Sequence, residues 1–179
     1  MLKLRELRRE DLLAINSWRA DRSQVACLGA PFRYIGPEVD GAWFDSYLKN
    51  RSNTVRCAIV DVDAPQTILG LATLSNINWV HRTCIFHVQV APGTQGCGVG
   101  AFALAGMLSH AFEDLGLNRV ELAVLDTNSR ARGMYERAGF VLEGTKRQAA
   151  YKEGHYVDMH IMGLLASEWR ARNAGRALQ

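Results

Sequence analysis

The sequence predicts a single α/β domain built around a mixed β-sheet. Its 179 residues suffice for one domain with a buried core and are few for two. Segments with the alternating pattern of strands are interleaved with segments that have the apolar spacing of helices. Only one strand–helix–strand unit occurs before the pattern changes to paired strands, so parallel and antiparallel neighbours are both expected. No repeat or low-complexity linker interrupts this order, and residues 1–179 are assigned to one domain.

The N-terminal half begins with a strand and a helix. Residues 2–7 alternate as a strand does, and the acidic pair Glu10-Asp11 precedes a helix with apolar residues on one face. Residues 21–41 contain several Gly and Pro residues and are expected to be irregular. The remaining elements of this half are a helix at 42–49 and strands at 55–62 and 68–76, joined by a turn at 63–66.

The C-terminal half carries the strongest helical pattern. Residues 98–115 place apolar side chains on a broad face, and Gly116 is suited to end the helix. Thr127-Asn128-Ser129 offers N-cap side chains for a second helix at 130–137, which Gly139 ends. The predicted strands of this half lie at 83–90, 119–125, 140–143 and 152–164.

Composition and charge exclude several classes of protein. The formal net charge is +3, and no apolar stretch approaches the roughly 20 residues that span a bilayer. Residues 1–6 alternate like a strand and lack the apolar region of a signal peptide, so a cytoplasmic location is expected. Arg170, Arg172 and Arg176 make the C-terminal tail basic. We interpret this tail as a solvated helix end, flexible from about residue 170, and expect neither a nucleic-acid nor a membrane partner.

The cysteines and histidines give no indication of a metal site. The four cysteines are far apart in the sequence and form no Cys-x-x-Cys pair. This spacing argues against a zinc site and against a disulfide framework. His155 and His160 are five residues apart on a predicted strand and therefore point to opposite faces. No metal is expected.

The most informative segment joins the strand at 83–90 to the helix at 98–115. It contains Gln95-Gly96-Cys97-Gly98-Val99-Gly100. Glycines between a strand and a helix N-terminus can hold phosphate on backbone N–H groups, because glycine permits positive φ angles and close approach. A P-loop would need Lys and Ser or Thr after the last glycine, and Ala101-Phe102 follows instead. Three interpretations remain: a Rossmann dinucleotide site, which the G-x-G-x-G spacing disfavours, a tight turn without a ligand, and a coenzyme A pyrophosphate site.

Two blocks of sequence resemble the GNAT superfamily of acetyl-CoA-dependent N-acetyltransferases. The first is Gln95–Gly100, which has the family's Gln/Arg-x-x-Gly-x-Gly signature directly after a strand. The second is residues 128–140, which match the pattern Asn-x-x-Ala-x-x-x-Tyr-x-x-x-Gly-Phe at every named position. The resemblance covers residues 2–169, and its last part, 154–169, is similar to the RimJ/RimL type, the ribosomal-protein alanine acetyltransferases. It implies a twisted, largely antiparallel sheet of about seven strands, flanked by helices and splayed at its central strands.

The resemblance also implies a site for acetyl-CoA as the acetyl donor. A bulge in the strand at 83–90 would expose backbone groups of Val88, Gln89 and Val90 to the pantetheine arm and thioester. The residues that would surround the pyrophosphate are Gln95, Gly96, Cys97, Gly98, Val99 and Gly100. Asn128 would bind the pantetheine amide, and Arg130 or Arg132 would reach the adenosine phosphates. Tyr135 is the candidate general acid that protonates the departing coenzyme A sulfur.

The base that deprotonates the attacking amine is not fixed by these motifs. His87, on the strand before the glycine turn, has an ordinary pKa of about 6.5, which suits the task. Asp158 ends Gly154–Asp158, which resembles the Gly-x-Tyr/Trp-x-Asp segment of the RimJ/RimL type. Glu38, Glu121 and a chain of water molecules remain alternatives.

The acceptor is expected to be a primary amine. A protein N-terminal or small amine of RimJ/RimL type ranks first, an amino group on a nucleotide-linked sugar second and a polyamine third. Residues 75–82 resemble a loop of spermidine acetyltransferases, but Arg33 and Arg51 flank the carboxylates that a polyamine would need. A domain that binds acetyl-CoA without turnover is the non-enzymatic alternative. Composition neither requires nor excludes a homodimer.

Overall fold

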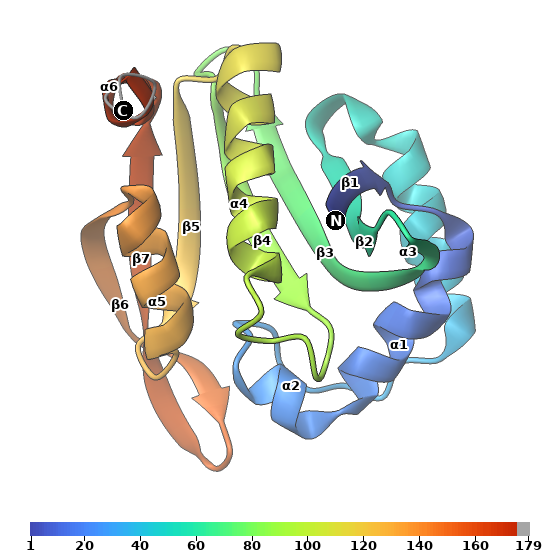
Figure 1. Cartoon of the computed structure of the whole chain (residues 1–179). Coiled ribbons are helices and arrows are strands. Elements are labelled where there is room, and N and C mark those ends of the chain that lie inside the picture. The colour runs from blue at the N-terminus through green and yellow to red at the C-terminus, as the bar shows by residue number, and fades with distance from the viewer. Residues whose placement is uncertain (175–179) are drawn as a thin grey trace.

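The computed structural model describes residues 1–174, which contain one seven-stranded sheet (Figure 1). Its strands are β1 (Leu2–Glu6), β2 (Val55–Asp61), β3 (Ala64–Asn78), β4 (Thr83–Val90), β5 (Arg119–Leu125), β6 (Val141–Lys152) and β7 (His155–Leu165). Their order in space is β1-β2-β3-β4-β5-β7-β6. β4 and β5 are parallel, and the other neighbours are antiparallel. The predicted mixed, largely antiparallel sheet of seven strands is confirmed.

Helices cover both faces of this sheet. They are α1 (Leu12–Ala20), α2 (Arg22–Ala26), α3 (Pro37–Lys49), α4 (Val99–Ser109), α5 (Ser129–Ala138) and α6 (Ala166–Ala174). α4 crosses in front of the central strands in Figure 1, and its Leu104 and Met107 pack in the larger core with Phe86 of β4 and Leu122 of β5. α1 and α3 contribute to a second core that includes Ala58 of β2. The glycine-rich turn between β4 and α4 lies at the edge of the larger core.

Two N-terminal boundaries differ from the sequence-based expectation. Residues 21–41, expected to be irregular, include α2 and the first turn of α3. The Asp21 carboxylate accepts a hydrogen bond from the Ser23 amide at 2.9 Å and so caps α2. A helix therefore forms in a segment whose Gly and Pro residues suggested a loop. Pro37 does not break α3 but begins it, since its missing N–H and fixed φ suit the first helical position.

The final hairpin was predicted wrongly. Strands at 140–143 and 152–164 were expected, whereas β6 continues to Lys152 and the turn is Glu153-Gly154. Both turn residues have positive φ, 47° and 91°. β6 is an edge strand on which nearly every side chain is exposed, so it lacks the alternation that marks a half-buried strand. A long strand of exposed side chains therefore forms where the sequence predicts a loop.

The C-terminal helix is docked to the rest of the fold. Arg170 donates to the Phe112 carbonyl at 3.4 Å, and Arg172 donates to the Arg137 carbonyl at 3.0 Å. Arg176, the third arginine of the predicted basic tail, lies outside the described residues. Within residues 1–174, no helix has the length and apolar character that crossing a membrane requires.

Candidate functional site

The sheet opens between its two parallel strands. β4 and β5 pair over three positions, from Thr83↔Arg119 to Ile85↔Glu121. Beyond them, residues 86–90 of β4 pair with β3, and residues 122–125 of β5 pair with β7. A wedge therefore separates the C-terminal halves of β4 and β5. Alternate residues of β4 direct their backbone N–H and C=O groups toward this wedge. The predicted splay of the central strands is confirmed.

The bulge expected in β4 does not occur in residues 85–90, all of which the structure describes. Their register with β3 runs without a shift from Ser75↔Ile85 to Gly70↔Val90. A bulge would leave one residue of β4 unpaired. Val88 and Val90 pack against the larger core, and the side-chain Nε2 of Gln89, which lies between them in the sequence, is buried without a hydrogen-bond partner among residues 1–174. The backbone of β4 is exposed to the wedge because β5 diverges, and not because β4 bulges.

The glycine turn, residues 93–100, connects β4 to α4. Gly93, Gly96 and Gly98 have φ angles of 80°, 85° and 82°. In this left-handed region a side chain is strained, so glycine is required even though a Cβ at these positions would have open space. At Gly100 the constraint is steric and weaker: a Cβ would lie 3.3 Å from the Met134 sulfur of α5, so that side chain would have to shift slightly.

The turn presents backbone N–H groups that could hold an anion. Two amides are used inside it: Thr94 donates to the Ala91 carbonyl at 3.2 Å, and Cys97 donates to the Thr94 carbonyl at 3.4 Å. The amides of residues 99–101 begin α4, where no earlier helical turn supplies carbonyl partners. The positive end of the helix dipole lies at the same place. This arrangement is suited to a phosphate group.

The Gln95 side chain joins the turn to two helices. Its Nε2 donates to the Gln24 side-chain oxygen of α2 at 2.7 Å. Its Oε1 accepts from Arg130 of α5 at 3.5 Å. The sequence-predicted residues Gln95 and Arg130 therefore meet at the mouth of the turn, together with Gln24, which sequence reasoning missed.

Tyr135 lies on α5 beside the wedge and is almost fully buried. Its ring is perpendicular to that of Phe86, with centroids 6.4 Å apart, and 5.9 Å from that of Phe140. Phe86 is the first residue of β4 beyond the pairing with β5, so this contact places Tyr135 where the wedge begins. Burial raises the pKa of Tyr135 to about 12, and the hydroxyl therefore keeps its proton at neutral pH.

Asn128 and Arg132 already have partners within the protein. The Asn128 Oδ1 accepts from the Ala131 amide at 3.1 Å and caps α5. Its Nδ2 donates to the Cys27 carbonyl at 3.0 Å. Arg132 pairs with Glu136 one turn along α5 at 2.8 Å.

His87 lies on β4 in a row of directly opposed residues, Arg56–Thr73–His87, across β2, β3 and β4. Its Nε2 is 2.9 Å from the Ser75 hydroxyl. Although part of the residue is exposed to solvent, desolvation by the surrounding residues and then the nearby Arg56 guanidinium lower the pKa of His87 below its ordinary 6.5. The imidazole is thus neutral at pH 7 and has a nitrogen lone pair that could accept a proton.

Asp158 is not brought to the face that carries His87. Asp158 and Met162 are four residues apart on β7, so they share the face of the larger core, whereas His87 is on the side of β4 opposite Phe86. The Asp158 carboxylate accepts from the Gln148 amide at 2.8 Å. Gln148 lies in the irregular part of β6 and has a φ of 50°, so this bond satisfies an amide that the ladder with β7 leaves free.

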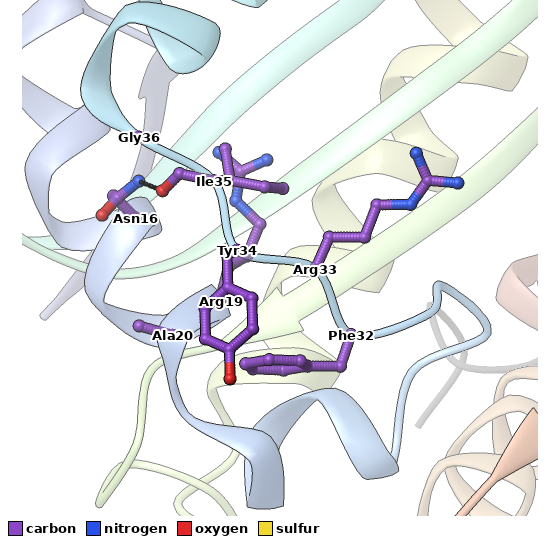
Figure 2. Close-up of a pocket in the computed structure, with 8 residues that line it drawn as sticks. All are labelled: Asn16, Arg19, Ala20, Phe32, Arg33, Tyr34, Ile35 and Gly36. Carbon is purple, nitrogen blue, oxygen red and sulfur yellow. Dashed lines mark hydrogen bonds between the residues drawn. The ribbon is translucent and has the colours of Figure 1, made fainter.

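A cavity of about 350 Å³ lies between α1 and the chain that leads to α3 (Figure 2). Its lining residues are Asn16, Arg19, Ala20, Phe32, Arg33, Tyr34, Ile35 and Gly36. Asn16 donates to the Ile35 carbonyl at 2.9 Å, and Phe32 and Tyr34 pack edge to face with centroids 5.3 Å apart. Arg19 pairs with the buried Asp40, and Arg33 is exposed. The lining thus contains two arginines and no carboxylate.

Two more residues near these features were missed by sequence reasoning. Arg56 of β2 stacks on the Trp43 ring of α3 at 4.2 Å. Lys152, at the end of β6, is buried and reaches both α2 and the segment after it. A hydrophobic pattern does not reveal either residue, because lysine and arginine are normally exposed.

The cysteines and acidic groups give no metal site in residues 1–174, where no cluster of three or more His, Cys, Asp or Glu side chains has ligating geometry. Burial raises the pKa of Cys57 to about 11 and that of Cys84 to about 12. These two thiols are therefore poor nucleophiles. Cys27 and Cys97 are exposed and free.

Comparison with known proteins gives a consistent result. Residues 1–141 match the model of the acetyltransferase (GNAT) domain. The chain is 30% identical over 173 residues to the spermidine N(1)-acetyltransferase of Vibrio cholerae, covering 96% of this chain and 97% of that one. It is 29% identical to the Escherichia coli enzyme of the same name, covering 96% and 90%. The crystal structure of spermidine N-acetyltransferase from Vibrio cholerae with CoA and spermine superposes with a TM-score of 0.88 at 27% identity, covering 94% and 98%.

Proposed function

The chain belongs to the GNAT family of acetyltransferases and transfers an acetyl group from acetyl-CoA to an amine, and on this premise we propose that the acceptor is a polyamine. The observation that carries the proposal is the full-length likeness to the Vibrio cholerae enzyme that was solved with CoA and spermine. This ranking reverses the order suggested by the sequence motifs, in which a RimJ/RimL-type acceptor came first.

We propose that the donor binds along the wedge and the glycine turn. The backbone of Val88 to Val90 would meet the pantetheine arm and thioester, and Gln95 to Gly100 would hold the pyrophosphate. Free amides and three left-handed glycines support this assignment. Asn128 and Arg130 would serve the pantetheine and phosphate ends, with Arg132 available once it leaves Glu136.

The chemistry requires a neutral amine, a polarised carbonyl and a protonated leaving group. An amide of β4 that faces the wedge would stabilise the oxyanion, and a single such donor typically contributes about 2.7–4 kcal/mol to lowering the barrier. As the C–S bond breaks, Tyr135 would donate a hydrogen bond to the sulfur and share its proton with the developing thiolate. The raised pKa supports this role, because the acid form is present at every physiological pH.

Between the two candidate bases we favour His87 over Asp158. His87 is neutral at pH 7, and its hydrogen-bonding partner is a single serine hydroxyl. The Asp158 carboxylate is engaged with the Gln148 amide on another part of the sheet. His87 could also remove the proton of the acceptor amine through an intervening water molecule, since its imidazole is neutral in that case as well.

A second acceptor class is favoured by one observation. The cavity beside α1 is lined by Arg19 and Arg33 and by no carboxylate, which suits an amine that also carries an anionic group. A protein N-terminus of RimJ/RimL type or a nucleotide-linked amino sugar would meet this description. Arg19 is already paired with Asp40, so a polyamine would leave Arg33 facing a cation.

A matched pair of small amines distinguishes the two classes. 1,4-Diaminobutane and 4-aminobutanoate have the same chain length, but the second charged group is cationic in one and anionic in the other. Release of free thiol from acetyl-CoA would be measured with both, with spermidine and with an N-terminal peptide. Spermidine and the diamine should give the higher kcat/KM. A preference for the amino acid or the peptide would reject the polyamine proposal.

A substitution in the cavity wall adds a second comparison to the same thiol-release assay. Arg33→Gln should leave polyamine turnover unchanged or raise it, because it removes a cation from the cavity wall. If the acceptor is anionic, this variant should instead raise KM for 4-aminobutanoate. Absence of turnover with every amine, despite CoA binding, would indicate a binding module.

A further inference from the structure

Lys152 is a buried lysine that reaches a distant part of the chain. Only 8% of the residue is exposed. Its Nζ donates to the Val25 carbonyl at 3.0 Å and to the Ala30 carbonyl at 2.6 Å. A buried ammonium group is costly unless its donors are satisfied. The two carbonyls therefore have to remain in place for Lys152 to stay buried.

Both carbonyls belong to one segment, residues 22–30, which we call the strap. It comprises α2 and the four residues that follow. In Figure 1, α2 lies beneath the ends of β4 and α4. At Gly29 the strap backbone comes so close to β7 that a Cβ would lie 3.3 Å from the Met159 methyl group.

The strap is also held by two residues of the proposed donor site. Gln95 of the glycine turn donates to Gln24, and Asn128 at the start of α5 donates to the Cys27 carbonyl. Both bonds are exposed to solvent, where water competes for the same groups. Lys152 provides the buried anchor among the three.

The strap also leads directly to the cavity. Two residues after Ala30, the chain begins the cavity wall at Phe32. One buried side chain from the β6–β7 hairpin thus fixes a segment that touches the donor turn at one end and the cavity wall at the other.

We propose that Lys152 is a positioning residue for acetyl transfer, which anchors the strap and thereby keeps Gln95 and Asn128 aligned for acetyl-CoA. This inference rests on the proposed function, which assigns these two residues to the donor. Without the anchor, the strap is held by exposed hydrogen bonds and samples positions in which the two side chains no longer face the donor.

The test compares Lys152→Met with Lys146→Met in the full chain. Lys146 is on the same strand but exposed, so its loss controls for the removal of one positive charge. Lys152→Met should raise the CoA dissociation constant about tenfold, measured by titration calorimetry, and should accelerate amide hydrogen exchange in residues 22–30. Lys146→Met should leave both unchanged. Unchanged CoA affinity in a folded Lys152→Met protein would overturn the proposal.

Gln24→Leu provides an independent test that leaves the buried anchor intact. It should also weaken CoA binding, because it removes the bond to Gln95. In the double variant, the two effects should combine to less than their product, because both release the same strap. Effects that multiply would show separate roles and reject the strap. CoA binding is measured without an acceptor, so a wrong choice of amine cannot affect this result.

Discussion

At the scale of single residues, the protonation of Tyr135 matters most. Burial raises its pKa to about 12, so the phenol loses its proton only as the pH rises through that region. A thiolate with an ordinary thiol pKa of about 8.5 is too weak a base to remove this proton in full. It can nevertheless receive a strong hydrogen bond while charge develops on sulfur. Tyr135 is therefore expected to act in the transition state and to contribute little to ground-state binding.

Removing the hydroxyl tests this role. Tyr135→Phe should lower kcat by about 10²–10⁴-fold and leave the CoA dissociation constant nearly unchanged, because the ring still packs on Phe86 and Phe140. In the parent protein, kcat should show no decline between pH 8 and 10 that this phenol causes, since its acid form persists there. Stopped-flow thiol release and calorimetry would measure the two constants. Wild-type turnover in the variant would exclude Tyr135 as the acid.

At the scale of elements, the turn between β4 and α4 depends on glycine backbone geometry. Gly98→Ala would place a Cβ on a residue with a φ of 82°, which costs roughly 1–2 kcal/mol. It should also weaken CoA binding, because a shift in this residue moves the first amides of α4. Gly116→Ala is a matched control: its φ is 62°, and it follows the helical segment that continues α4, away from the turn.

The comparison of the two variants separates strain from binding. Both should lower the midpoint of thermal unfolding by a similar amount, and only Gly98→Ala should raise the CoA dissociation constant. Equal CoA affinity in both variants would contradict the assignment of the turn.

Sequence patterns predicted the strands in which buried and more exposed side chains alternate. β4 and β5 have the bounds that their apolar residues indicated, because one or both faces meet the core. β6 was misjudged because its side chains face solvent. The turn was predictable because Gly96 and Gly98 adopt positive φ angles, which glycine favours. The burial of Lys152 was not predictable from its neighbours in the sequence, because the segment that buries it is more than 120 residues away.

At the scale of the whole molecule, one sheet joins the two largest of the cores in residues 1–174. The larger core lies under α4 and the smaller one under α1 and α3. The cavity and the strap belong to the side of α1 and α2, whereas the turn and Tyr135 belong to α4 and α5. The proposed acceptor and donor residues thus come from different parts of the fold, and this explains why no single sequence motif contained both.

The wedge between β4 and β5 has a kinetic consequence. Both substrates are expected to occupy the wedge together, each entering from its own face of the sheet. Cys57 and Cys84, with pKa values raised to about 11 and 12, are unsuited to carry the acetyl group between them. Double-reciprocal plots at several fixed acceptor concentrations should therefore intersect, as for a sequential mechanism through a ternary complex. Parallel lines would require an acetylated enzyme, and mass spectrometry after incubation with acetyl-CoA alone would detect it.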